Sequence, residues 1–290
     1  MSDFLITTDC GADLPDDYLK DNDIFCAQLT CTICGETHGG RKPQLPYSEF
    51  YSLMRAGNLP KTSQVNPDEA QEYLESLLER TKKLLVLAFS SGLSGTYNSF
   101  RVAAEEIMEE RKDVQIQVVD SKCASLGQGL WVYKVMEYRN SGKSFEETAD
   151  YAREIAGKIV HVFTVDDLNH LYRGGRVSKS AAFFGTVLNI KPVLHVDDEG
   201  KLIPLEKVRG RKKSLLRLVE MMGEQMGSYK DKNDIVFISH GDCIEDAEFV
   251  RDEVKARFGV EKFMINHIGP VIGAHAGPGT IALFFMGDRR

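Results

Sequence analysis

The sequence lacks any apolar run that approaches the ~20 residues needed to span a lipid bilayer. Its first residues, MSDFLITTDCGADLP, carry acidic side chains where a secretory signal peptide requires basic ones. It also lacks low-complexity tracts and long runs of like charge, which are features of disordered segments, and it shows no internal repeat. We therefore expect an ordered globular protein that is cytoplasmic and does not insert stably into a membrane.

Net positive charge is also missing. The 290 residues carry a net charge of -7, and the sequence pI is near 5.6. A protein whose main task is to bind nucleic acid phosphates normally presents a basic surface, so nucleic acid is not an expected partner. The only dense basic cluster, KVRGRKKSLLR at 207–217, leaves a DNA-binding or regulatory role open as a third alternative.

Cysteines are few, at positions 10, 26, 31, 34, 123 and 243, and in a reducing compartment they are not expected to form disulfides. Cys26, Cys31 and Cys34 have the C-x4-C-x2-C spacing of a plant-type iron–sulfur loop. However, the segment 24–33 alternates like a single strand, which would point the first two thiols to opposite faces, and no fourth ligand is evident. We interpret these thiols as small apolar side chains and expect no cluster.

In the first half of the chain, short apolar runs alternate with amphipathic helical segments. The Asn66-Pro67-Asp68 sequence and the pair Ser144 and Glu147 mark two helix starts. This alternation is typical of βαβ units and predicts an α/β fold, with a mostly parallel sheet flanked by helices. The expected strands are 4–10, 24–33, 83–90 and 114–121, and the expected helices are 66–83, 96–112, 126–142 and 145–159.

The second half mixes hairpin and crossover connections. Two strands within 190–210 are joined at Asp197-Asp198-Glu199-Gly200, a hairpin signal. We predict an α+β domain with a mixed sheet here. Since 290 residues suit two domains, we place an N-terminal domain at 1–158 and a C-terminal domain at 159–290. The other expected elements are strands 159–165, 234–241, 262–269 and 280–287, and helices 166–175, 212–226 and 245–259.

The stretch VLAFSSGLSGTYNSF at 86–100 predicts a strand, a Gly/Ser loop and a helix start, an arrangement that favours anion binding. Gly92-Leu93-Ser94-Gly95-Thr96 differs from the nucleophile elbow G-x-S-x-G only at its last position. No Lys follows Gly95, so the stretch does not fit a P-loop. One interpretation is therefore a Ser-dependent esterase or thioesterase that uses Ser94 with His275 as its base.

Other polar residues have ordinary structural explanations beside functional ones. Thr62 and Ser63 precede a helix in an expected loop, where hydroxyl residues are common caps, but Asn66 can serve as the cap instead. Arg173 and Arg176 flank a Gly-Gly turn and could be surface charges or a ligand clamp. No H-E-x-x-H or similarly dense spacing of metal ligands occurs, so no metal site is expected.

Seven motifs, in order along the whole chain, resemble those of the DegV family of bacterial proteins. They are TTDCGADLP at the N-terminus, KTSQ at 61–64, SSGLSGTYNS at 90–99, VDS at 119–121, LYRGGRVS at 171–178, SHGD at 239–242 and GAHAGPGT at 273–280. The resemblance implies an EDD/DegV-like two-domain α/β protein that buries a long-chain fatty acid between its domains.

The resemblance further implies a carrier that is not itself an enzyme and has no cofactor besides its fatty acid. It would present the acyl carboxylate to a FakA-like, ATP-dependent fatty acid kinase for acyl-phosphate formation in phospholipid metabolism. Arg176 and Arg173 would contact the head group or the partner. The carboxylate-binding residues implied in this sequence are Thr62, Ser63, Ser91, Gly92, Ser94, Gly95 and His275.

Overall fold

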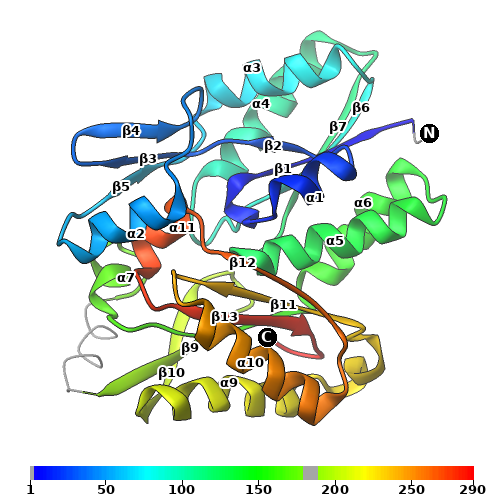
Figure 1. Cartoon of the computed structure of the whole chain (residues 1–290). Coiled ribbons are helices and arrows are strands. Elements are labelled where there is room, and N and C mark those ends of the chain that lie inside the picture. The colour runs from blue at the N-terminus through cyan, green and yellow to red at the C-terminus, as the bar shows by residue number, and fades with distance from the viewer. Residues whose placement is uncertain (1–2, 179–188) are drawn as a thin grey trace.

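The computed structural model describes residues 3–178 and 189–290, which form three β-sheets with helices packed around them (Figure 1). None of the helices in these two ranges is both long and apolar enough to cross a membrane. The elements before residue 158 are β1 (Leu5–Asp9), α1 (Asp16–Asp21), β2 (Phe25–Ala27), β3 (Thr30–Ile33), β4 (Glu36–Gly39), α2 (Tyr47–Arg55), β5 (Lys61–Ser63), α3 (Pro67–Leu78), β6 (Lys83–Ala88), α4 (Thr96–Glu110), β7 (Gln115–Asp120), α5 (Leu126–Asn140) and α6 (Phe145–Ala156).

The later elements contain the second large sheet. They are β8 (Ile159–Thr164), α7 (Asn169–Arg173), β9 (Ile190–Val196), β10 (Leu202–Arg209), α9 (Arg211–Gln225), β11 (Ile235–His240), α10 (Ile244–Phe258), β12 (Lys262–His267), α11 (Pro270–Ala276) and β13 (Ile281–Met286).

The first sheet, which we call sheet A, has the strand order β2-β1-β6-β7, and all its pairings are parallel. Five of the six residues of β6 are buried, as expected for a strand covered on both faces. Two helices that pack on this sheet, α3 and α6, begin where the sequence predicts: Asn66 and Ser144 both form complete capping boxes, with Glu69 and Glu147. The predicted parallel sheet flanked by helices is confirmed.

The second large sheet, sheet C, has the order β10-β9-β8-β13-β11-β12 and mixes parallel with antiparallel pairs. The predicted hairpin is present, because β9 and β10 pair antiparallel around the turn at 197–200. β13 lies between β8 and β11 and is antiparallel to both, although it follows them in the sequence. The prediction of a mixed C-terminal sheet is confirmed.

The prediction of one strand over 24–33 is wrong. β2 pairs with β1 in sheet A, whereas β3 belongs to a separate small sheet, sheet B, with the order β4-β3-β5. Buried and partly exposed residues alternate without interruption from Ala27 to Ile33, across the break between β2 and β3. The apolar pattern of the sequence therefore does not reveal the change of sheet. The backbone N–H of Leu29, at the break, lies 3.2 Å from the Cys10 sulfur.

The helix α5 joins sheets A and C. Its residues from Leu126 to Val132 are all buried, and one continuous apolar cluster extends from Ile6 and Leu87 in sheet A through α5 to Phe237 and Phe284 in sheet C. In Figure 1, α5 lies in the middle of the molecule between the two sheets. The division into domains 1–158 and 159–290 remains a prediction.

Candidate functional site

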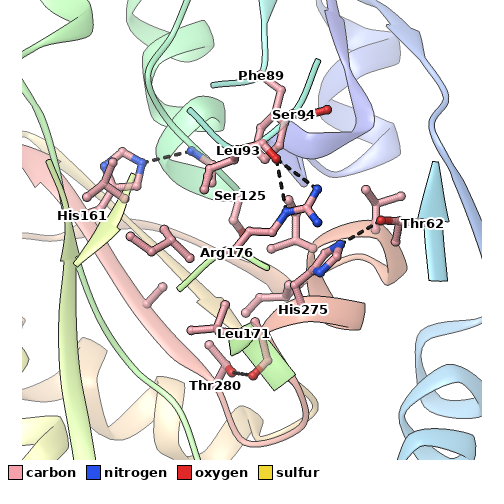
Figure 2. Close-up of a pocket in the computed structure, with 18 of the residues that line it drawn as sticks. Thr62, Phe89, Leu93, Ser94, Ser125, His161, Leu171, Arg176, His275 and Thr280 are labelled. Atoms are coloured by element: carbon pink, nitrogen blue, oxygen red, sulfur yellow. Dashed lines mark hydrogen bonds between the residues drawn. The ribbon is translucent and has the colours of Figure 1, made fainter. Parts of the chain in front are cut away.

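A cavity of about 530 Å³ lies between the carboxyl ends of the sheet A strands and one face of sheet C (Figure 2). This volume is in the range typical of small-molecule sites, ~300–1,000 Å³. Its walls are formed by the loop after β6, the start of α5, strand β5, helix α11, and strands β8, β9, β10 and β13. Both large sheets therefore contribute to one site.

Most of the wall is apolar. Phe163, Val196, Leu202 and Phe284 line it from sheet C. His161 lies among them, with its ring edge-to-face against Phe284 at a centroid distance of 5.1 Å.

Both ring nitrogens of His161 are occupied by the backbone. Nε2 accepts the N–H of Ala124 at 3.2 Å, and Nδ1 donates to the carbonyl of Ile159 at 3.1 Å. Burial lowers the pKa of His161 to about 3, so the ring is neutral. It therefore acts as part of the apolar wall and is not a free polar group.

Thr62 and His275 mark the polar end of the cavity. The hydroxyl oxygen of Thr62 lies 2.8 Å from Nε2 of His275, as Figure 2 shows. His275 is in the last turn of α11, and its Nδ1 is buried without a hydrogen-bond partner among the described residues. Burial, with a smaller effect of the nearby Arg176 charge, lowers the pKa of His275 to about 4. The imidazole is therefore neutral at pH 7.

Arg176 brings a positive charge to the same end. Its Nε and one terminal nitrogen donate to the carbonyl of Leu93 at 3.2 and 3.1 Å, and its other terminal nitrogen donates to the carbonyl of Gly174. Within residues 3–178 and 189–290, no carboxylate forms an ion pair with it. Burial lowers the pKa of Arg176, but a guanidinium remains protonated at neutral pH. Among the residues that the structure describes, this partly buried cation forms hydrogen bonds only with backbone carbonyls.

Ser94 lies on the wall near Leu93, at the start of α4. Its hydroxyl accepts the N–H of Thr96 at 3.2 Å and lies 3.0 Å from the Thr96 hydroxyl. The N–H of Gly95 donates to the side-chain carbonyl of Gln64 at 3.1 Å. Side chains therefore already satisfy these two N–H groups at the start of the helix.

The structure brings Thr62, Ser63, Ser94, Gly95, Arg176 and His275 together around the cavity. Three other predicted site residues do not line it. The hydroxyl of Ser91 accepts a hydrogen bond from Lys122 at 2.7 Å, and Arg173 lies 3.1 Å from Nδ1 of His170 near the surface.

Gly92, the third of these, packs against the β9–β10 turn. A Cβ atom at Gly92 would lie 2.6 Å from the carbonyl oxygen of Glu199. The close approach of two backbones explains the glycine, so no ligand contact is needed to account for it.

The local structure at Thr62 and Ser63 differs from the sequence prediction, and His275 lies on a helix that is not among the expected elements. Thr62 and Ser63 lie in β5, paired with β3, and not in a loop. His275 belongs to a short helix, α11, that begins with Gly269 as its N-cap and Pro270 in its first turn. Glycine and proline obscure this helix in the sequence.

Gln64 and Ser125 are polar wall residues that the sequence patterns do not single out. Gln64 directly follows the two hydroxyl residues of β5, and this position in the KTSQ motif is the signal that could have identified it. Ser125 has a backbone φ of 54° at the start of α5, which is unusual for a residue other than glycine. No spacing in the sequence reveals such a conformation.

The alternative chemistries find little support in this geometry. Ser94 bonds to Thr96, whereas His275 bonds to Thr62, so no nucleophile–base pair is formed. Across the described part of the chain, no group of three or more His, Cys, Asp or Glu side chains is placed to hold a metal ion. The basic cluster at 207–217 is partly neutralised, since Arg211 pairs with Asp246 and Arg217 with Glu224.

Comparison with known proteins gives one family over the whole length. The family model described as "Uncharacterised protein, DegV family" matches residues 3–288. A DegV domain-containing protein of Clostridium perfringens is 42% identical over 291 residues, which cover 100% of this chain and 99% of that protein.

Solved structures agree. A DegV lipid-binding protein from Thermotoga maritima has a TM-score of 0.85 and 30% identity, with 100% of both chains covered. DegV from Bacillus subtilis, a fatty acid binding protein, has a TM-score of 0.84 and 28% identity, covering 99% of this chain and 100% of its own. The chain belongs to the DegV family, as its motifs predict.

Proposed function

We propose that this protein binds a long-chain fatty acid in the cavity, with the carboxylate beside Arg176 and the tail along the apolar wall of sheet C. The observation that carries the proposal is Arg176, a partly buried cation without a paired acid in the described ranges, at one end of a mostly apolar cavity. A charge in this position favours an anionic ligand group. The ligand would lie between the two predicted domains, 1–158 and 159–290.

The tail would supply most of the affinity. Burial of each CH2 group is worth ~0.8 kcal/mol, so a long chain gains ample free energy from Phe163, Leu202 and Phe284. The head then needs only a few hydrogen-bond donors. Thr62 and Ser94 provide hydroxyls, and the guanidinium of Arg176 provides charge-assisted donors. Fatty acid binding by DegV family proteins from Thermus thermophilus and Bacillus subtilis supports this ligand class.

His275 would act through Thr62. A neutral imidazole whose Nε2–H donates to the Thr62 oxygen leaves the Thr62 hydroxyl hydrogen free to point at the ligand. A bound carboxylate accepts hydrogen bonds only, so this orientation of Thr62 is the productive one. His275 is therefore a positioning residue in this proposal.

We further propose that the protein is a carrier that is not itself an enzyme, and that it presents the carboxylate to a FakA-like, ATP-dependent fatty acid kinase in the cytoplasm. The side chains of Ser63 and Gln64, which border the polar end, are exposed. The head group would therefore lie near the surface, where a partner's active site can reach it. The absence of a P-loop sequence supports phosphoryl transfer by a separate subunit.

The ligand is tested with purified protein stripped of lipid. Native mass spectrometry and calorimetric titration with hexadecanoic acid should show one tightly bound molecule, and Thr62→Val and Ser94→Ala should each weaken binding about 10-fold. If hexadecanoic acid neither binds nor raises the melting temperature of the stripped protein, the proposal is wrong. A fluorophosphonate probe that labels the protein, but not the Ser94→Ala variant, would support the esterase instead.

The carrier role needs its own test. The loaded protein is mixed with a FakA-like kinase and ATP, and acyl phosphate is trapped with hydroxylamine. The hydroxamate should appear only when all three components are present. If the kinase alone acts equally well on free hexadecanoic acid, the carrier role is wrong while fatty acid binding stands.

A further inference from the structure

The two hydroxyls at the polar end lie on segments that no sheet pairing connects. Thr62 lies on β5, a three-residue strand at the edge of sheet B. Ser94 lies in the loop that joins β6 of sheet A to α4. Sheet hydrogen bonds therefore do not fix the separation between them, and another contact has to do so.

The Gln64 side chain connects the two segments. Its carbonyl oxygen accepts the backbone N–H of Gly95 at 3.1 Å, and its amide nitrogen donates to the Ser99 hydroxyl at 3.3 Å. For the described residues, all hydrogen bonds between segments 61–65 and 90–99 pass through this one amide. Gln64 is two residues from Thr62, and Gly95 directly follows Ser94.

Gly95 is shaped for this contact. A Cβ atom at Gly95 would lie 2.3 Å from the side-chain oxygen of Gln64 and 2.8 Å from its amide carbon and nitrogen. Any other residue at position 95 would therefore displace the Gln64 amide. The N-cap of α4 is Gly95, which has no side chain to cap the helix. The side-chain oxygen of Gln64 accepts the Gly95 N–H, which would otherwise lack a partner at the helix start.

We propose that Gln64 is the positioning residue that sets the spacing between the Thr62 and Ser94 hydroxyls for a carboxylate. The inference rests on the proposed function. A carboxylate holds its two oxygens at a fixed separation and accepts from both donors at once, so its affinity depends on that spacing. A fatty alcohol has one oxygen and is far less sensitive to it. Gln64 therefore sets selectivity for the acid head group.

The test compares hexadecanoic acid with hexadecan-1-ol in calorimetric titrations. Gln64→Met, which keeps the length of the side chain but removes both hydrogen bonds, should lower affinity for the acid about 10-fold and for the alcohol less than about 3-fold. Gly95→Ala should act in the same direction by displacing the amide. Gln71→Ala is the matched control, since Gln71 is on α3 and bonds to Glu75 at 3.4 Å.

A double-mutant cycle separates positioning from a general loss of structure. If Gln64 places the hydroxyls, Thr62→Val should weaken acid binding much less in the Gln64→Met background than in the natural protein. Equal losses for acid and alcohol, or strictly additive effects of the two substitutions, would overturn the inference. In those cases the natural protein still binds the acid. If the natural protein does not bind the acid at all, the proposed function fails, and the inference fails with it.

Discussion

The hydroxyl of Ser125 donates a 2.5 Å hydrogen bond to the buried carboxylate of Asp13. The other oxygen of that carboxylate accepts the N–H of Gly269, the N-cap of α11, at 2.9 Å. Ser125 also lies 2.8 Å from the hydroxyl of Ser239 in sheet C. Asp13 therefore joins the loop after β1 to the start of α5 and to the helix that carries His275.

The first prediction concerns Asp13→Asn. Burial raises the pKa of Asp13 from 3.8 to about 7, so the folded state holds a proton that the unfolded state releases. The protonated Asp13 carboxyl therefore adds to the free energy of unfolding at low pH, and this contribution is lost as the pH rises from about 4 to about 7. Asn keeps the shape and tolerates the φ of 50°, but it cannot titrate.

Urea unfolding at pH 5 should show the Asp13→Asn variant less stable than the natural protein by about 1–3 kcal/mol. The difference should shrink toward pH 7.5, because the natural protein alone loses the contribution of the protonated carboxyl. A difference in unfolding free energy that stays constant with pH would contradict a raised pKa for Asp13.

The second prediction concerns His275→Gln, for which the stability difference from the natural protein should depend on pH in the opposite sense to Asp13→Asn. The pKa of His275 is lowered from 6.5 to about 4, so the unfolded state binds a proton first, and stability is lost as the pH falls from about 6.5 to about 4. Because Gln does not titrate, the variant does not lose this contribution to stability at low pH. The natural protein should exceed the variant in stability more at pH 7 than at pH 4.5. Imidazole nitrogen shifts measured by NMR should show a neutral ring at pH 7.

Arg176→Gln should weaken fatty acid binding about 10-fold to 100-fold, because it removes the positive charge beside the proposed carboxylate. Binding of hexadecan-1-ol should change little. The matched control is Arg173→Gln, which alters a nearby arginine that does not line the cavity. Titration calorimetry with both ligands distinguishes the two variants. Equal effects of Arg173→Gln and Arg176→Gln would show that general surface charge, and not the cavity, governs binding.

Gly92→Ala should destabilise the protein by about 1–3 kcal/mol, because the added Cβ meets the backbone of the β9–β10 turn at Glu199 and Gly200. Gly157 offers a matched control, since a Cβ there has no heavy atom within 4 Å and its φ is -76°. Gly157→Ala should be neutral or stabilising by up to about 1 kcal/mol. The urea midpoints of the Gly92→Ala and Gly157→Ala variants, compared with the natural protein, test these two expectations. If Gly92→Ala does not lower stability, the β9–β10 turn can shift to make room for the added Cβ, and the close contact does not explain the glycine.

Elements with strong local signals could be predicted from the sequence. The capping boxes at Asn66 and Ser144 and the apolar runs of sheet A mark their own boundaries, and the turn at 197–200 marks the hairpin. The helix α11 and the break between β2 and β3 could not be predicted. Both depend on partners distant in the chain. The Asp13 side chain caps the start of α11, and β2 pairs with β1 whereas β3 pairs with β5 in another sheet.

The candidate site shows the same limit. The motifs identify Thr62, Ser94 and His275, but not which of them interact. Thr62 and His275 are 213 residues apart in sequence, and only the fold reveals that they bond to each other. Gly92 occurs in the same motif as Ser94 but packs against the β9–β10 turn, a structural requirement that looks identical to a functional one when only the sequence is read.

The place of β13 has a consequence for synthesis on the ribosome. β8 and β11 leave the ribosome before β13, which pairs with both of them. Until β13 inserts between them, one edge of each strand has no partner. β13 also carries Ala282 and Phe284 on the cavity wall. The nascent chain therefore exposes the unpaired edges of two apolar strands until β13 has been synthesised, and only then can a ligand be enclosed. Premature termination before residue 281 should yield an aggregation-prone fragment without a lipid pocket.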